Sequence, residues 1–513
     1  MFSILCLEND SALRLRGTNR MKTAAVIGAG LGGLSASIYL QSKGWNVDIY
    51  EAQSFPGGKA AEETFDGYRF DIGPSLVTMP WVFEDIFKAA GKDIHNELTL
   101  VRLEEICTYF LSDGTYLKAW SNLQKFGEEL ERVAAGSQKA LKKYLKVAEK
   151  SHKLGGKLFL TQPIHETRTL LKPSTLSKLI RFVGIHPFST LNEINEKYFK
   201  DPRIVQIFNR YATYNGSSPY QTPATMIIIP FVEYIGGGYG IKEGIYEIPK
   251  KLHKASEDLG VKFFFNQRVE KINLHKKKIC GITVKSEDKD YDVVVSDTDV
   301  LATYNTLLEL PTLKQAKRYK KLEPSSSGIV FYWGINRSFE ELSVNNIFFS
   351  SDYPAEFQAI FKKNTMPKEP TVYVNITSKL TPTDAPEGCE NWFVLLNAPA
   401  NYSQNWDELV SDARNSTITL LSKRLKTDIE PHIVTEGILT PPDIERRTGS
   451  TYGSLYGISS NTKTSAFMRH RNRSKNIKGL YFCGGSAHPG GGMPLVILSG
   501  KICAHLIEKF SSD

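Results

Sequence analysis

The stretch that decides the fold reads AAVIGAGLGGLSASIYLQS and spans residues 24–42. Residues 24–27 form an apolar run typical of a buried strand, and residues 34–42 have the apolar spacing of a helix. A second apolar run, residues 47–50, ends at Glu51. Strand, glycine turn, helix, strand and acidic residue follow one another in the order that a dinucleotide-binding βαβ unit requires.

Each glycine of this turn has a physical role. Gly28 permits the tight turn out of the first strand, and Gly30 has no Cβ, so a pyrophosphate can approach the backbone there. Gly33 allows the helix to pack closely on the sheet. The helix N-terminus offers unpaired N–H groups to the phosphates, and Glu51 offers acceptors to ribose hydroxyls. We therefore predict that this turn, Gly32 included, binds a dinucleotide.

Two motifs after the second strand distinguish FAD from NAD. The segment PGGK, residues 56–59, resembles the x-G-G-R extension of the flavin amine oxidase superfamily. The segment YRFDIGPS, residues 68–75, resembles the F-D-x-G-P segment of bacterial-type carotenoid (phytoene) desaturases. Lys59 stands where Arg is usual, so it offers a point charge without the bidentate fork. The resemblance implies that backbone amides and the basic residue meet the FAD pyrophosphate and its surroundings, from Gly58, Lys59, Gly73, Pro74, Ser75 and Leu76.

The far end of the chain resembles the same family independently. Residues 479–485, GLYFCGG, indicate a strand entering a glycine turn, and SAHPGGGMP at 486–494 leads into a helix. In the family this turn and helix point at the flavin, where the helix N-terminus stabilises negative charge on the reduced ring. We expect His488 to shape the turn rather than to act as a base. The resemblance implies FAD contacts from Gly484, Gly485, Gly492 and Met493.

A third piece lies in the middle of the chain, where strands are expected up to the Ser296-Asp297 turn. By resemblance, Val269 packs against the adenine and Asp297 lies at the cofactor, although Val269 as an ordinary core residue is an equal alternative. The expected fold class is therefore α/β, with a Rossmann-like FAD-binding domain and an α+β substrate domain that has a mixed sheet and a helical, membrane-facing subdomain. The FAD domain is expected to comprise residues 21–105, 231–304 and 451–513. The substrate domain is expected to comprise residues 106–230 and 305–450, with the helical part at about 150–200.

Composition restricts the class of protein. The chain has 513 residues, of which 41% are hydrophobic and 23% charged, as in ordinary globular proteins of more than one domain. Its six cysteines lie far apart without a C-x-x-C, which argues against a disulfide framework or a zinc site and favours a reducing, cytoplasmic compartment. No metal site is predicted. Residues 1–20 lack the features of a secretory signal, and no apolar run reaches 18 residues, so membrane contact is expected to be peripheral.

One segment indicates where that contact lies. Residues 153–184 contain six basic residues and one acid, Glu166, interleaved with aliphatic and aromatic residues. Such a pattern suits anionic headgroups and acyl chains, although a buried helix pair with a solvated face is the alternative. We favour the membrane because the substrates of the resembling family reside in bilayers. No nucleic-acid-binding motif surrounds the basic residues, so nucleic acid is not an expected partner.

The resemblance implies an FAD-dependent desaturase that introduces a C=C bond into a long carotenoid by hydride transfer to flavin. The segment GPSLVTMP, residues 73–80, resembles hydroxycarotenoid 3,4-desaturases at least as well as phytoene desaturases. We therefore expect a hydroxycarotenoid 3,4-desaturase, with a phytoene desaturase, a carotenoid isomerase and a flavin amine oxidase as alternatives. No catalytic base is assigned, and the electron acceptor stays open between a quinone and oxygen.

Overall fold

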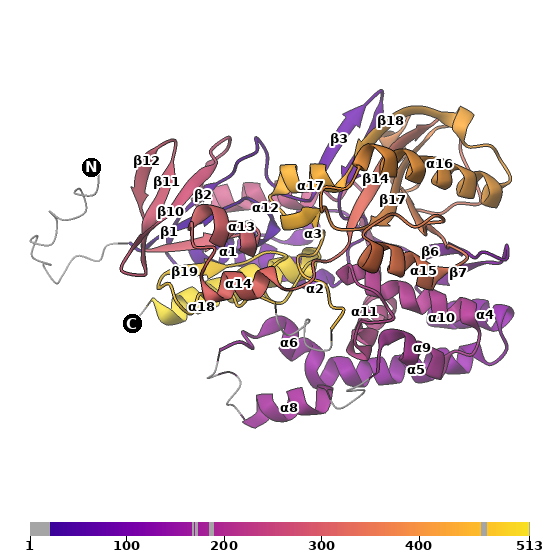
Figure 1. Cartoon of the computed structure of the whole chain (residues 1–513), viewed down its shortest axis with the longest axis horizontal. Helices are drawn as coiled ribbons and strands as arrows, with labels where there is room; N and C mark the ends of the chain where they lie inside the picture. The colour runs from indigo at the N-terminus through magenta and orange to yellow at the C-terminus, as the bar shows by residue number, and fades with distance from the viewer. Residues whose placement is uncertain (1–20, 167–168, 170–172, 184–188, 463–468, 512–513) are drawn as a thin grey trace, which may run out of the picture.

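The computed structural model describes residues 21–166, 169, 173–183, 189–462 and 469–511. Figure 1 shows two sheet-containing regions beside each other and a layer of helices below the second. Strands within residues 23–50, 269–290 and 480–482 lie in the first region, and strands within residues 327–335, 390–398 and 433–439 lie in the second. The fold is thus mixed α/β, as expected.

The first region contains a five-stranded parallel sheet in the order β19-β13-β1-β2-β9. Its strands are short and apolar, which suits a parallel sheet buried on both faces. The predicted order of strand, glycine turn, helix and strand is confirmed at β1, α1 and β2. The sheet and its main helices are β1 (Thr23–Ile27), α1 (Leu31–Gln41), β2 (Asn46–Tyr50), α12 (Glu247–Asp258), β9 (Lys262–Phe264), β13 (Val293–Ser296), β19 (Leu480–Phe482) and α18 (Met493–Phe510).

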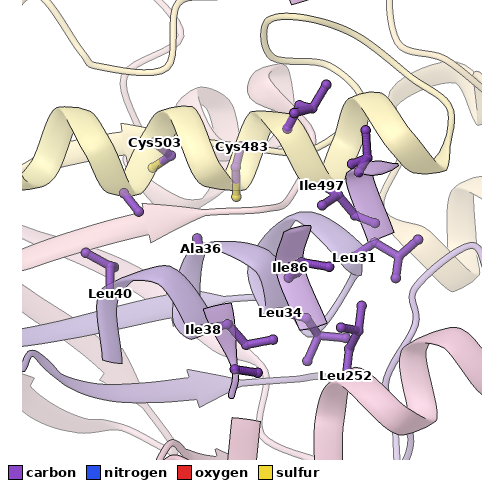
Figure 2. Close-up of a cluster of buried hydrophobic side chains, with 14 of the residues drawn as sticks. Leu31, Leu34, Ala36, Ile38, Leu40, Ile86, Leu252, Cys483, Ile497 and Cys503 are labelled. Atoms are coloured by element: carbon purple, nitrogen blue, oxygen red, sulfur yellow. The ribbon is translucent and has the colours of Figure 1, made fainter. Parts of the chain in front are cut away.

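Helix α1 is buried along most of its length, because α18 covers it on one side and the parallel sheet on another. Leu34, Ala36 and Ile38 are fully buried, and Figure 2 shows them with Ile497 and Cys503 of α18 in one cluster. The Ser35 hydroxyl donates to the Ile497 carbonyl at 2.7 Å. A helix that is apolar on all sides is stable only when enclosed in this way.

A second layer of this region is an antiparallel sheet of β10 (Val269–His275), β11 (Lys278–Val284) and β12 (Glu287–Asp290). Its inner face packs on β1 and β13 in a single cluster of buried side chains. The strands expected up to the Ser296-Asp297 turn are therefore present, as β10, β11, β12 and β13.

The second region is built on a mixed seven-stranded sheet in the order β18-β14-β17-β16-β15-β6-β7, in which only β15 and β6 pair in parallel. Alternate residues of β14, β16 and β17 pack under helix α16, and the other face turns toward β4. These elements are β4 (Tyr68–Ile72), β6 (Glu105–Phe110), β7 (Tyr116–Trp120), β14 (Ser327–Ile335), β15 (Asn345–Phe348), β16 (Val372–Ile376), β17 (Glu390–Ala398), α16 (Trp406–Leu425) and β18 (Ile433–Leu439).

The helical layer contains α4 (Leu123–Val133), α5 (Ser137–Ser151), α6 (Lys157–Thr161), α8 (Pro173–Val183), α9 (Leu191–Tyr198), α10 (Pro202–Asn209) and α11 (Ile228–Gly236). Two basic residues of the predicted amphipathic stretch, Arg168 and Lys172, lie outside the described residues. Within the ranges given above, no helix combines the length and the apolar content needed to cross a bilayer.

Smaller elements complete the chain. They are β3 (Ala61–Phe65), α2 (Pro80–Ala89), α3 (Ile94–Glu97), β5 (Leu100–Arg102), β8 (Tyr239–Ile241), α13 (Val300–Ala302), α14 (Lys314–Lys320), α15 (Tyr353–Gln358) and α17 (Pro441–Thr448). Strands β3 and β4 form a hairpin, and β5 pairs with β8.

Candidate functional site

The first glycine turn is held tightly between β1 and α1. The Gly28 amide donates to the Tyr50 carbonyl at 2.8 Å, and its φ of +102° lies in the region that favours glycine. A Cβ on Gly33 would lie 2.1 Å from the Gly28 carbonyl oxygen, so only glycine fits where α1 leaves the turn. No side chain caps α1 at Gly30. The helix therefore presents backbone N–H groups at the C-terminal edge of the sheet.

Glu51 lies against this turn at the end of β2. Its carboxylate accepts from the Ala29 amide and from the Gln53 amide, each at 2.8 Å, and it keeps some solvent exposure. The Glu51 carbonyl accepts from the Gln267 amide at 2.9 Å, which brings the start of β10 to the same edge. Val269, two residues further on, is 5% exposed and belongs to the core.

Asp297 lies between the N-terminal and the C-terminal glycine turns. It follows β13, and its amide donates to the Ile27 carbonyl at 2.9 Å. A Cβ added to Gly30, Gly32 or Gly484 would lie 2.5, 2.3 or 2.5 Å from its carboxyl oxygens. Burial raises the pKa of Asp297 to about 7, while hydrogen bonds from the Gly33 amide and the Cys483 thiol oppose this shift.

The C-terminal glycine turn lies directly beside the first one. A Cβ on Gly32 would approach the Gly484 nitrogen to 2.8 Å, and a Cβ on Gly485 would lie 3.7 Å from the Gly491 Cα. Gly492 is exposed, has a φ of +95° and begins α18 without a side-chain cap, while Met493 is buried. The turns after β1 and β19 therefore meet at one edge of the parallel sheet, as the expected FAD domain of separate segments requires.

The residues of the PGGK and GPS segments extend this edge. The Gly57 amide donates to the Ala29 carbonyl at 2.8 Å, and a Cβ on Gly58 would lie 3.3 Å from the Gly30 Cα. A Cβ on Gly73 would lie 2.0 Å from the Lys59 carbonyl oxygen. Gly73 is exposed, and the three residues after it in the chain are half-buried: Pro74, Ser75 and Leu76.

The Lys59 side chain makes contacts that the sequence did not predict. Its Nζ donates to the carbonyls of Ser454 and Leu455 at 2.8 and 2.9 Å. Burial lowers the pKa of Lys59 to about 8, and the nearby carboxyls of Asp299 and Asp297 oppose this shift. The ammonium therefore connects the segment around residue 455 to the PGGK segment.

Arg469 is a further residue that the motifs did not reveal. It is 4% exposed and donates to three carbonyls, those of Tyr456 and Gly485 at 2.7 and 2.9 Å and that of Ile458 at 3.2 Å. A single arginine outside any motif carries no signal in the sequence. Through its hydrogen bond to the Gly485 carbonyl, Arg469 stabilises the C-terminal glycine turn.

His488 is buried, and burial lowers its pKa to about 3, so the ring is neutral near pH 7. Its Nε2 lies 2.9 Å from the Gln162 carbonyl oxygen. Because a carbonyl only accepts, Nε2 carries the proton. The ring therefore anchors the C-terminal turn to the segment after α6, which fits a turn-shaping role.

The residues at this edge fit FAD. Glycines remove side chains where a pyrophosphate must approach the backbone, and two helices begin there without a side-chain cap. These backbone amides suit phosphate and an electron-rich ring, and the Glu51 carboxylate suits ribose hydroxyls. The sequence predicted most of these residues, and the structure brings the N-terminal and C-terminal sets together.

Comparison with known proteins agrees with this geometry. Residues 31–365 match the family described as flavin containing amine oxidoreductase. The chain is 42% identical to the 1-hydroxycarotenoid 3,4-desaturase of Flavobacterium sp. (strain P99-3), over 95% of this chain and 99% of the relative. It is 31% identical to the 4,4'-diaponeurosporene oxygenase of Staphylococcus haemolyticus (strain JCSC1435), over 95% and 97% of the two chains.

Solved structures support the fold. The cyclohexylamine oxidase of Brevibacterium oxydans IH-35A superposes with a TM-score of 0.63 at 14% identity, covering 96% of this chain and 100% of that one. A putrescine oxidase bound to putrescine gives the same TM-score and identity, with 96% and 99% covered. The chain belongs to the flavin containing amine oxidoreductase family and is an FAD-dependent oxidoreductase.

Proposed function

We propose that this enzyme is a 1-hydroxycarotenoid 3,4-desaturase. The observation that carries the proposal is the 42% identity to the Flavobacterium desaturase along nearly the whole of both chains. Such coverage includes the substrate region as well as the cofactor motifs. The GPSLVTMP segment, residues 73–80, supports the same substrate class.

We further propose that the FAD domain comprises residues 21–105, 231–304 and 451–513, and that the substrate domain comprises 106–230 and 305–450. The parallel sheet draws its strands from all three segments of the former, which supports this division. The residues proposed to contact FAD are Gly28, Gly30, Gly32, Gly33, Glu51, Gly58, Lys59, Gly73, Pro74, Ser75, Leu76, Val269, Asp297, Gly484, Gly485, Gly492 and Met493.

When bound, FAD accepts two electrons as a hydride, so desaturation removes one hydrogen as hydride and a neighbouring one as a proton. A quinone or oxygen is proposed as the final oxidant. The protein excludes water and orients the polyene. The uncapped start of α18 at Gly492 would stabilise negative charge on a reduced flavin bound at this edge. His488, neutral and anchored, positions the turn, and we assign no catalytic base.

The face of the seven-stranded sheet that turns away from α16 suits a carotenoid. Two of its side chains, Tyr373 and Leu395, keep some solvent exposure, and other residues of this face pack toward β4, which leads into the GPS segment. Partly exposed apolar and aromatic side chains suit a long polyene, because apolar surface gains free energy when it leaves water.

We propose that α8 attaches the enzyme peripherally to a membrane. Leu176 and Ile180, one helical turn apart, are 49% and 63% exposed, and Arg181 is exposed beside them. In Figure 1, α8 lies at the lower edge of the molecule, away from both sheets. Apolar side chains next to a basic residue suit acyl chains and anionic headgroups.

The decisive experiment is to incubate the purified holoenzyme with a 1-hydroxycarotenoid and determine product masses. The expected result is the loss of two hydrogens and a new conjugated bond at C3–C4. Incorporation of an oxygen atom would instead indicate a terminal oxygenase like the staphylococcal relative, and an unchanged mass would indicate an isomerase. Peroxide release with amines and no reaction with carotenoids would refute the proposal.

A further inference from the structure

Two partly exposed side chains of the seven-stranded sheet lie within a short chain of contacts from the glycine motifs. Tyr373 and Leu395 pair directly in the middle of the seven-stranded sheet, yet both keep solvent-accessible surface. Leu395 lies near Leu455, because a Cβ on Gly328 would contact the Cδ1 atoms of both, at 2.8 and 3.5 Å. The Leu455 carbonyl oxygen accepts a hydrogen bond from the Lys59 Nζ. The Lys59 carbonyl oxygen in turn lies next to Gly73, which is exposed.

These contacts connect the glycine motifs with the sheet, and one polar pair makes a second connection. The Ser75 Oγ lies 2.7 Å from the Tyr373 hydroxyl. Ser75 follows Gly73 by two residues and is half-buried. A partly exposed hydroxyl group thus lies close to the glycine motif, and its partner Tyr373 pairs with the apolar, partly exposed Leu395.

The hydrogen bonds behind this pair have a fixed direction. The Asn345 Nδ2 donates to the Ile106 carbonyl at 3.0 Å, so its Oδ1 turns toward Tyr373. That Oδ1 accepts from the Tyr373 hydroxyl at 2.7 Å and from the Asn375 Nδ2 at 2.9 Å. Burial raises the pKa of Tyr373, so the phenol stays neutral with one proton to donate.

Because the Tyr373 proton goes to Asn345, the Ser75 hydroxyl must donate its own proton to Tyr373. The Ser75 Oγ then keeps two lone pairs and has no proton left to offer. Any further group that bonds to the Ser75 Oγ must therefore be a hydrogen-bond donor.

We propose that the Ser75 Oγ accepts a hydrogen bond from the tertiary hydroxyl of the substrate, with Tyr373 and Asn345 as positioning residues that fix its polarity. This inference rests on the proposed function and names the group that selects the substrate. The FAD contact proposed above for Ser75 is through its backbone, whereas its Oγ bonds to the Tyr373 hydroxyl. An alcohol satisfies the acceptor, whereas a methyl ether or a hydrocarbon end does not.

The location of this acceptor suits the reaction. In a 1-hydroxycarotenoid the oxygen on C1 is separated by three bonds from C3, so a contact to the hydroxyl lies beside the bond to be oxidised. Holding the hydroxyl at Ser75 orients C3 and C4 directly. A site built to bond a substrate hydroxyl also discriminates strongly against an analogue that lacks it.

The test compares Ser75→Ala, Ser75→Thr and Tyr373→Phe with the wild-type holoenzyme on three substrates, the 1-hydroxycarotenoid, its methyl ether and its 1-deoxy analogue. For Ser75→Ala, the ratio of kcat/KM for the alcohol to that for the deoxy analogue should fall about tenfold, the effect of one hydrogen bond. Ser75→Thr keeps the hydroxyl and should restore the ratio. Tyr373→Phe frees the Ser75 proton, so preference for the alcohol over the methyl ether should fall.

Tyr332→Phe is the matched control. Its hydroxyl is buried on the same sheet face and has no hydrogen-bond partner in the described part of the chain, so the ratio should stay at the wild-type value. FAD content and alcohol affinity, from titration of the flavin absorbance with product, provide readouts besides turnover. Ser75→Ala should lower product affinity and retain FAD.

Failure of the proposed function and failure of the Ser75 contact give different results. If the wild-type enzyme desaturates none of the three compounds, the proposed function is wrong. Suppose instead that the wild-type enzyme desaturates the alcohol. The hydroxyl contact at Ser75 is then refuted if Ser75→Ala keeps the wild-type ratio, or if this variant loses FAD and its kcat/KM falls equally on all substrates. The desaturase proposal stands in both cases.

Discussion

Replacing Gly500 with alanine tests whether the packing of α18 on α1 holds the two glycine turns together. A Cβ at this position would lie 2.5 Å from the Gly32 carbonyl oxygen, 2.6 Å from the Ser35 Cβ and 2.7 Å from the Ala36 nitrogen. Two of these atoms are backbone, so no change of rotamer relieves the clash. Since real Cβ atoms essentially never approach closer than 3.0 Å, the helices must separate by about half an ångström.

The cost follows from two opposing effects. Overpacking of a buried contact destabilises a protein by about 1–3 kcal/mol, and a clash with backbone belongs at the upper end. Alanine gains about 1 kcal/mol over glycine within a helix, so the net loss should be about 2 kcal/mol. The separation also displaces Gly32 and the start of α18, so FAD should bind more weakly.

The assay is denaturant unfolding of the apoprotein together with FAD retention after gel filtration. Gly236→Ala is the control, because Gly236 ends α11 and its Cβ would meet nothing within 4 Å. This variant should equal or slightly exceed the wild type in stability. Equal stability of the Gly500→Ala and Gly236→Ala proteins, with full FAD occupancy in both, would refute the reasoning.

Three further outcomes are expected. Glu51→Ala should weaken FAD binding tenfold or more in titrations of the apoprotein, because a charged acceptor is lost, and unchanged affinity would exclude the ribose contact. Asp297→Asn should remove a pH dependence: the folded pKa is raised from 3.8 to about 7, so the wild-type fold holds a proton that the unfolded chain releases, and stability falls as pH rises through this window. Unfolding midpoints of the two apoproteins at pH 5 and pH 8 measure the difference, and identical pH dependence would contradict it. Ile180→Glu should reduce cosedimentation with anionic vesicles roughly tenfold, because an apolar contact is lost. Ile438→Glu, at a residue 45% exposed on β18, is the control, and equal binding by both variants would exclude attachment through α8.

The sequence by itself predicted most of the residues at the edge of the parallel sheet where FAD is proposed to bind. An apolar run, spaced glycines and helical periodicity act within about 30 residues, so β1, the turn, α1 and β2 were predicted with their roles. The closing turn before α18 was predicted by resemblance, and so was Asp297. Local sequence is informative here because backbone geometry, such as the positive φ of Gly28, restricts the residue type directly.

Only the tertiary structure decided which of these residues contact one another and which other residues hold them in place. Asp297 lies against Gly30 and Gly484, although 267 residues separate it from the first and 187 from the second. The Arg469 contacts with carbonyls and the hydrogen bond between Ser75 and Tyr373, 298 residues apart, carry no local signal. Such contacts depend on how strands far apart in the chain come together in a sheet, because sheet pairing places side chains beside partners that local periodicity does not specify.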